Sequence, residues 1–197
     1  PVRICAVGYG KLGGWELGYT SDLDLVFLHD SVGADQHTDG ARALDNQMFF
    51  VRFVQRLVHL LSMHSAAGRL YEVDMRLRPS GKGGMLITNI EAFRDYQQRE
   101  AWTWEHQALL HARAVAGARP LCARFEALRM DILQQCVRRD SLQTDVRQMR
   151  ERMRAELSQP DPTRFDLKKD AGGLADIEFL AQYWALRWAD RYPPVAQ

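Results

Sequence analysis

Two aspartates near the start of a strand-like segment have the types and spacing to do chemistry. Asp22 and Asp24 lie in the segment Ser-Asp-Leu-Asp-Leu, which opens an apolar run ending at His29. Because side chains of a strand alternate between its faces, the two carboxylates project from the same face. Like charges this close repel each other, and a cation such as Mg²⁺, which prefers oxygen ligands, relieves the repulsion. The pair therefore predicts a metal site.

A third aspartate follows on a segment that also alternates. In residues 69–78 apolar side chains fall on one face and charged ones on the other, namely Glu72, Asp74, Arg76 and Arg78. If the two strands are neighbours, three carboxylates can hold two ions about 4 Å apart, a separation that clamps the attacking and leaving oxygens of a phosphoryl displacement. Asp22, Asp24 and Asp74 are therefore the predicted catalytic and metal-binding residues.

The glycine-rich turn before the aspartates has competing interpretations. Residues 8–13 read Gly-Tyr-Gly-Lys-Leu-Gly after an apolar strand, which matches a dinucleotide-binding fingerprint, with Asp30 in place to contact a ribose. That fold needs a crossover of a dozen or more residues, and only the eight residues 14–21 separate Gly13 from Asp22. A Walker-type loop is disfavoured because Leu12, not Ser or Thr, follows Lys11.

The favoured interpretation is a turn that cradles a nucleoside triphosphate. Backbone amides of the glycine loop would contact the phosphates, and Lys11 would add positive charge. Arg76 and Arg78 share the face of Asp74, so contact with a phosphate or with a partner is favoured for both over a solvated strand edge. The predicted nucleotide-binding residues are Gly10, Lys11, Gly13, Gly14, Ser21, Arg76 and Arg78.

The elements that must position these residues divide the chain by pattern. Strand patterns cover residues 2–7, 21–29, 69–78 and 85–88. Helical patterns cover residues 41–64, 90–96, 121–137, 142–157 and 174–190. We therefore predict an α+β fold with two domains: a sheet with flanking helices in residues 1–118, and the start of an all-helical bundle in residues 119–197.

Composition limits the classes of partner. The 197 residues carry 26 Lys and Arg against 25 Asp and Glu, a net charge of +1, which predicts neither a nucleic-acid partner nor an anionic membrane surface. Three separated cysteines without a Cys-x-x-Cys pair favour a reducing cytoplasm. The chain opens on Pro1 with a strand pattern already under way, so we expect a fragment truncated at both ends.

Several motifs together resemble a known family. Residues 10–25 resemble the signature of the nucleotidyltransferase superfamily, whose fold is shared with DNA polymerase beta. Within it, residues 8–18 resemble the glutamine synthetase adenylyltransferase family. Further motifs follow in the family's order, at residues 73–81, 102–108, Lys168 and 172–179.

The resemblance implies a nucleotidyltransferase-like fold and an enzyme that moves AMP from ATP to a tyrosine of glutamine synthetase, with two Mg²⁺ ions on the three aspartates. Residues 100–108 and 28–30 resemble the C-terminal, adenylylating unit. The unit that removes AMP by phosphorolysis, and a nucleotide-sensing module without turnover, are the alternatives. A PII-type nitrogen-signalling protein is an implied partner of the full-length enzyme. For Lys168, Asp176 and Glu178, a structural role and a role near the nucleotide both stay open.

Overall fold

The computed structural model describes residues 2–33, 36–64, 66, 68, 71–157 and 163–196. It consists of two compact units, each described here by itself. The first contains Pro1–Glu100 and His111–Arg129, and the second contains Ala101–Leu110 and Met130–Gln197. Helix α5 (Arg119–Gln135) begins in the first unit and ends in the second. The predicted domains, 1–118 and 119–197, stay a prediction.

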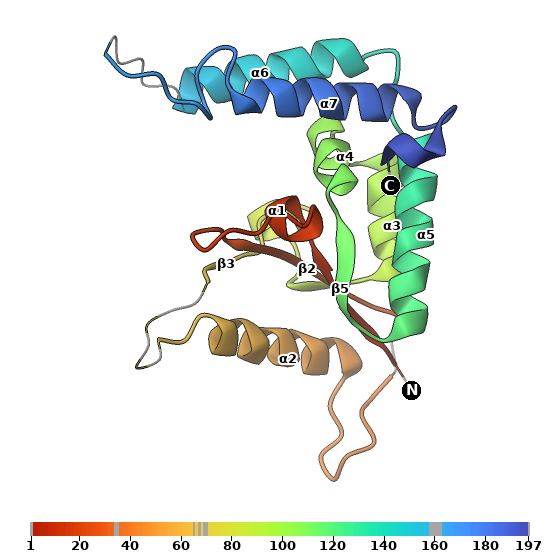
Figure 1. Ribbon diagram of the computed structural model, residues 1–197. Coiled ribbons are helices and arrows are strands. Elements are labelled where there is room, and N and C mark those ends of the chain that lie inside the picture. Colours follow the sequence, from red (N-terminus) through yellow and green to blue (C-terminus); the bar gives the residue numbers. More distant parts are fainter. Residues whose placement is uncertain are drawn as a thin grey trace. The chain divides into compact units, whose positions relative to one another are not determined.

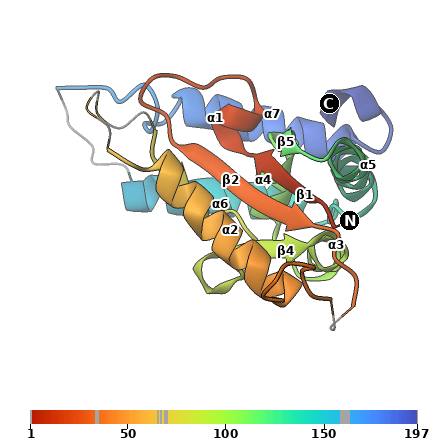
Figure 2. The same ribbon diagram turned by 90° about the horizontal axis from the view of Figure 1, so that it is seen from below.

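The first unit is built on a mixed sheet in which β2 is central. Strand β1 (Ile4–Gly8) pairs antiparallel with β2 (Leu23–His29), and β5 (Arg113–Gly117) pairs antiparallel with β1. Two short strands, β3 (Val73–Asp74) and β4 (Ile87–Asn89), pair parallel with β2, near its start and its end respectively. Figure 2 shows β2 with β1 on one side and β4 on the other. The predicted first two strands are thus confirmed.

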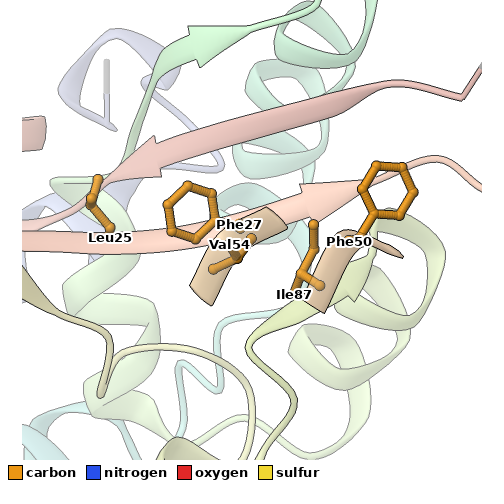
Figure 3. Close-up of a cluster of buried hydrophobic side chains, with 5 residues drawn as sticks. All are labelled: Leu25, Phe27, Phe50, Val54 and Ile87. Carbon is orange, nitrogen blue, oxygen red and sulfur yellow. The ribbon is translucent and has the colours of Figure 1, made fainter. Parts of the chain in front are cut away.

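Helix α2 (Asn46–Leu61) covers one face of this sheet (Figures 1 and 2). Its Phe50 and Val54 pack against Leu25 and Phe27 of β2 and Ile87 of β4, and all five side chains are buried (Figure 3). The helix begins later than the predicted residue 41, because the Asp45 carboxylate accepts a 3.0 Å hydrogen bond from the Met48 amide and so caps it.

Helix α3 (Ile90–Arg99) starts where the sequence predicts, and Asn89 caps it by accepting a 2.7 Å hydrogen bond from the Glu91 amide. Within the first unit α3 and α5 lie side by side, with the rings of Phe93 and Phe125 6.1 Å apart between centroids (Figure 1). Both rings are fully buried, so this contact adds a second apolar layer to the unit.

The prediction of a strand over residues 69–78 is wrong in length. Residues 69 and 70 lie outside the described residues, and β3 contains only Val73 and Asp74. The chain then turns, because the Arg78 guanidinium donates to the carbonyls of Met75 (2.6 Å), Lys82 (3.1 Å) and Gly84 (3.2 Å). These bonds hold residues 75–84 in a compact turn in place of an extended strand.

The second unit is helical. It contains α4 (Thr103–Leu110), α6 (Leu142–Leu157), α7 (Leu174–Trp188) and a 3₁₀ turn at Pro193–Ala196. Helix α4 packs against both α6 and α7. Two hydrogen bonds between side chains stabilise these contacts. The Thr103 hydroxyl donates to Asp145 at 2.6 Å, and the Gln107 amide donates to Gln182 at 3.0 Å. The two units confirm the predicted α+β class.

None of the helices in the described part of the chain has the length and apolar character needed to cross a membrane.

Candidate active site

Parallel pairing of β2 and β3 brings two of the three predicted aspartates together. Leu23 is the register partner of Val73, and Asp24 is the partner of Asp74. A 2.7 Å hydrogen bond from the Leu23 amide to the Glu72 carbonyl extends the pairing. Neighbouring strands lie about 4.8 Å apart and paired residues share a face, so the two carboxylates are direct neighbours. Asp22 precedes β2 by one residue and is exposed.

Asp24 has an unusual electrostatic environment. Burial of its side chain raises its pKa to about 6, and the negative charges of Asp74 and Asp22 add to the shift, while Arg76 opposes it. Each of these causes except Arg76 disfavours the ionised carboxylate. The Asp24 carboxylate therefore lies within electrostatic reach of both Asp74 and Asp22.

Asp74 is already partnered by a cation. The Arg76 guanidinium donates to Asp74 Oδ2 through Nε at 2.6 Å and through Nη2 at 2.5 Å, and the Arg76 amide donates to Oδ1 at 2.8 Å. These bonds hold the pKa of Asp74 below its usual range. The Arg76 side chain is 69% exposed, so its guanidinium has room to leave the carboxylate.

The donor set fits a hard cation in its chemistry. Asp22, Asp24 and Asp74 offer carboxylate oxygens, the ligands that Mg²⁺ prefers, and a cation would relieve the repulsion that Asp74 and Asp22 exert on Asp24. Within the described residues, however, no group of three or more His, Cys, Asp and Glu side chains has the arrangement of a metal site. Asp74 faces the Arg76 guanidinium, which supplies the positive charge there.

The glycine turn fits closely against the aspartates. It forms α1 (Gly10–Gly13), a single helical turn between β1 and β2. Gly10 has φ +52°, and a Cβ at this position would lie 2.7 Å from Asp24 Oδ2. The Tyr9 amide donates to the Asp24 carbonyl at 2.9 Å. The turn and the carboxylate are therefore in direct contact, and residue 10 has no space for a side chain.

Glycine is required at position 13 because the turn packs closely against other backbone atoms. A Cβ at Gly13 would lie 1.7 Å from the His111 carbonyl oxygen and 2.5 Å from that of Gly8. At Gly14 a Cβ would meet His111 Nδ1 at 3.1 Å, a tight but less severe approach. These glycines thus allow the turn to pack against the residues just before β5.

The antiparallel pairing of β1 and β2 rules out the dinucleotide interpretation of the glycine turn. A dinucleotide-binding unit joins parallel strands through a crossover helix, whereas β1 and β2 run antiparallel with only α1 between them.

The remaining predicted nucleotide contacts differ in their surroundings. Lys11 is exposed, and Ser21 is buried with its hydroxyl accepting a 3.1 Å hydrogen bond from the Gly18 amide. Arg78 is turned onto backbone carbonyls, as described above, so its bonds serve the turn at residues 75–84. The structure therefore brings Gly10 and Arg76 to the aspartates, while Arg78 is occupied elsewhere.

Arg113 is a residue that sequence reasoning missed. From the start of β5 it donates to the carbonyls of Leu12 and Gly13, both at 3.1 Å, and its guanidinium carbon lies 3.6 Å from the centroid of the Trp15 ring. Arg113 thus stabilises the end of α1 through these contacts. No local pattern could reveal this role, because its partners lie about a hundred residues earlier in the chain.

In the second unit, Asp176 has a structural explanation. It accepts hydrogen bonds from the Gly172 amide and from Arg150 Nε, both at 2.6 Å, and from Arg154 at 3.2 Å. The Gly172 bond is the main cause that lowers the pKa of Asp176, with Arg150 and Arg154 adding to it. Lys168 and Glu178 are exposed. These contacts favour the structural alternative for Asp176.

Comparison with known proteins identifies the family of the chain. A family model described as "Glutamate-ammonia ligase adenylyltransferase" matches residues 1–129, which include the glycine turn and all three aspartates. The bifunctional glutamine synthetase adenylyltransferase/adenylyl-removing enzyme of Thioalkalivibrio sulfidiphilus (strain HL-EbGR7) is 56% identical over 189 residues, which make up 96% of this chain and 20% of that protein. The chain thus spans about a fifth of the length of this relative. Because the family model matches more than half of the chain, the chain belongs to the glutamate-ammonia ligase adenylyltransferase family.

Proposed function

We propose that this chain transfers AMP from ATP to a tyrosine hydroxyl of glutamine synthetase and releases pyrophosphate. The observation that carries the proposal is the register of β2 and β3, which sets Asp24 beside Asp74 with Asp22 two residues away. The name of the relative, which includes an adenylyltransferase acting on glutamine synthetase, supports the choice of substrate.

The proposed reaction is an in-line displacement at the α-phosphorus. A bond forms between the phenolic oxygen and this phosphorus, the bond to the bridging oxygen of the β-phosphate breaks, and pyrophosphate leaves. The phenolic proton passes to the Asp74 carboxylate or, where the metal alone activates the phenol, to water. Mg²⁺ held by Asp22, Asp24 and Asp74 would supply the charge that lowers the phenol pKa from about 10 and stabilises the phosphates.

The neighbouring residues have roles that follow from their places. Gly10 lets the backbone of α1 approach Asp24 closely, so a triphosphate can lie against the turn beside the carboxylates. Lys11, Gly13, Gly14 and Ser21 belong to the same proposed cradle. Arg76, once free of Asp74, places its guanidinium where negative charge develops on the phosphates. Arg78 holds the turn from which Arg76 projects.

We further propose that the chain is the adenylylating unit, that it acts in the cytoplasm in nitrogen regulation, and that a PII-type protein is a partner of the longer polypeptide. Both the adding and the removing activity stand in the relative's name, so the choice between them rests on the motifs at residues 28–30 and 100–108.

A labelling experiment tests this proposal. The protein is incubated with glutamine synthetase, Mg²⁺ and ATP labelled at the α-phosphate, and label on the partner is measured. We expect transfer by the wild type and a loss of about a hundredfold or more in Asp22→Asn, Asp24→Asn and Asp74→Asn. Asp30→Asn, at the far end of β2 where Asp30 bonds the Arg3 amide, is the matched control and keeps the activity.

Two outcomes would contradict the assignment. Equal labelling by wild type and the three aspartate variants would remove the metal site from the reaction. Absence of labelling, together with release of ADP from adenylylated glutamine synthetase when phosphate is added, would make the chain the removing unit.

A further inference from the structure

Two aromatic side chains are almost fully exposed on the loop that leads to the aspartates. Trp15 is 81% exposed and Tyr19 is 99% exposed, seven and three positions before Asp22. In Figure 1 this loop runs outward from α1 before the chain enters β2. Rings of this size bury apolar area when a partner covers them, and Trp and Tyr are enriched among the residues that dominate protein interfaces.

Trp15 has a backbone conformation that is unfavourable for a residue with a side chain. Trp15 has φ +62°, in the left-handed region. The Glu16 amide donates to the Lys11 carbonyl at 2.8 Å across it, which is the closing bond of a Schellman motif after α1. Glycine is the usual residue at this place in the motif, because it adopts positive φ without steric strain. A local need for a turn therefore does not explain a tryptophan here.

Arg113 fixes the orientation of this ring. Its guanidinium covers one face of Trp15 at 3.6 Å, while the same group bonds the carbonyls of Leu12 and Gly13. The ring is thus tied to the end of α1, and most of its surface remains in water. A ring held in one orientation before binding loses little conformational entropy when a partner covers it.

The exposure of the two rings indicates the kind of partner. A small ligand binds in a concave site that encloses most of its surface. Tyr19, with 99% of its surface in water, stands outside any such enclosure. A folded protein, in contrast, must cover the surface around the carboxylates if one of its hydroxyl groups is to reach them. The loop at residues 14–20 directly adjoins Asp22, so it lies within that footprint.

We infer that Trp15 and Tyr19 form an aromatic anchor that binds the protein substrate next to its acceptor tyrosine. The inference rests on the proposed function, since it assigns the surface that recognises the protein in that reaction. Arg113 acts here as a positioning residue, through the ring of Trp15 and the backbone of α1.

Replacing Trp15 by glycine separates recognition from folding. Trp15→Gly removes the ring and supplies the residue that the left-handed backbone favours, and Tyr19→Ala removes the second ring. Phe53→Ala, which deletes a 43% exposed ring on α2, is the matched control. Asparagine also tolerates positive φ, so Trp15→Asn replaces Trp15→Gly if the glycine variant has a lower melting temperature than the wild type.

AMP transfer is measured in two series. In the first, the concentration of glutamine synthetase is varied at saturating ATP, and in the second, the concentration of ATP is varied at saturating glutamine synthetase. The direct binding of glutamine synthetase is measured separately, without ATP. We expect the KM and Kd for glutamine synthetase to rise about tenfold or more in Trp15→Gly and Tyr19→Ala. The KM for ATP should stay within about twofold of the wild type, as should both constants in Phe53→Ala.

A rise in the KM for ATP with unchanged binding of glutamine synthetase would make the rings a nucleotide contact and overturn the inference. Unchanged constants for both substrates in Trp15→Gly and Tyr19→Ala would also overturn it while leaving the proposed function intact. Failure of the wild type to transfer AMP would instead overturn the proposed function.

Discussion

At the scale of single residues, Asp24 shows a conflict between stability and chemistry. Its pKa is raised to about 6 by burial and by Asp74 and Asp22, above the usual 3.8. The folded state therefore holds the proton more tightly than the unfolded chain, and stability falls as pH rises from about 4 to 6. In metal-free buffer, Asp24→Asn should raise the free energy of unfolding by about 1–2 kcal/mol at pH 7.5, a figure reduced for partial exposure.

Urea unfolding at pH 7.5 and pH 4 tests this prediction, because the gain should vanish at the lower pH, where Asp24 is protonated in the folded state. Asp30→Asn provides the comparison at the other end of β2. An equal increase in the free energy of unfolding at both pH values would show that burial and neighbouring charges do not destabilise the ionised Asp24 carboxylate.

Arg76 gives a second prediction at this scale. Its guanidinium occupies Asp74 Oδ2, so a divalent ion must compete with it for this oxygen. Arg76→Gln should therefore bind Mn²⁺ several-fold more tightly than the wild type, with Arg76→Lys between the two, as measured by calorimetry. Weaker binding in Arg76→Gln would mean that the arginine holds Asp74 in place for the metal.

At the scale of elements, the sequence predicts what depends on local pattern. Apolar runs and helical spacing locate β1, β2, α3, α5, α6 and α7 to within a few residues, whereas α2 begins at Asn46 and not at residue 41. The same patterns predict that Asp24 and Asp74 are neighbours, which the register of β2 and β3 confirms, while the catalytic role of Asp22, Asp24 and Asp74 stays a prediction. The length of β3 does not follow, since side chains can alternate through a turn as well as a strand, and bonds from Arg78 decide between them. Arg113 contacts α1 only through the pairing of β5 with β1.

The packing of α1 against the residues before β5 can be tested at Gly13. A methyl group there would collide with the carbonyl oxygens of His111 and Gly8, and backbone atoms cannot move aside cheaply. Gly13→Ala should therefore destabilise the first unit by about 2–4 kcal/mol in thermal or urea unfolding. Gly40→Ala, where none of the described residues lies within 4 Å of the added Cβ, should have a free energy of unfolding within about 0.5 kcal/mol of the wild type. Equal effects of the two substitutions would contradict the tight packing of the turn.

At the scale of the whole molecule, the two compact units have separate sources of stability. The second unit holds a buried arginine, Arg150, whose Nε bonds Asp176 at 2.6 Å. Asp176→Ala leaves this guanidinium without its carboxylate, and should destabilise the second unit by about 1–3 kcal/mol. Trp15 belongs to the first unit and the other four of the five tryptophans to the second, so fluorescence of a Trp15→Phe variant reports the second unit alone. In that background Asp176→Ala should lower the melting temperature measured by fluorescence. Gly13→Ala lies in the first unit, so it should lower this melting temperature only if the two units unfold together. A shift by Gly13→Ala as large as that by Asp176→Ala would show that the two units share a single cooperative transition.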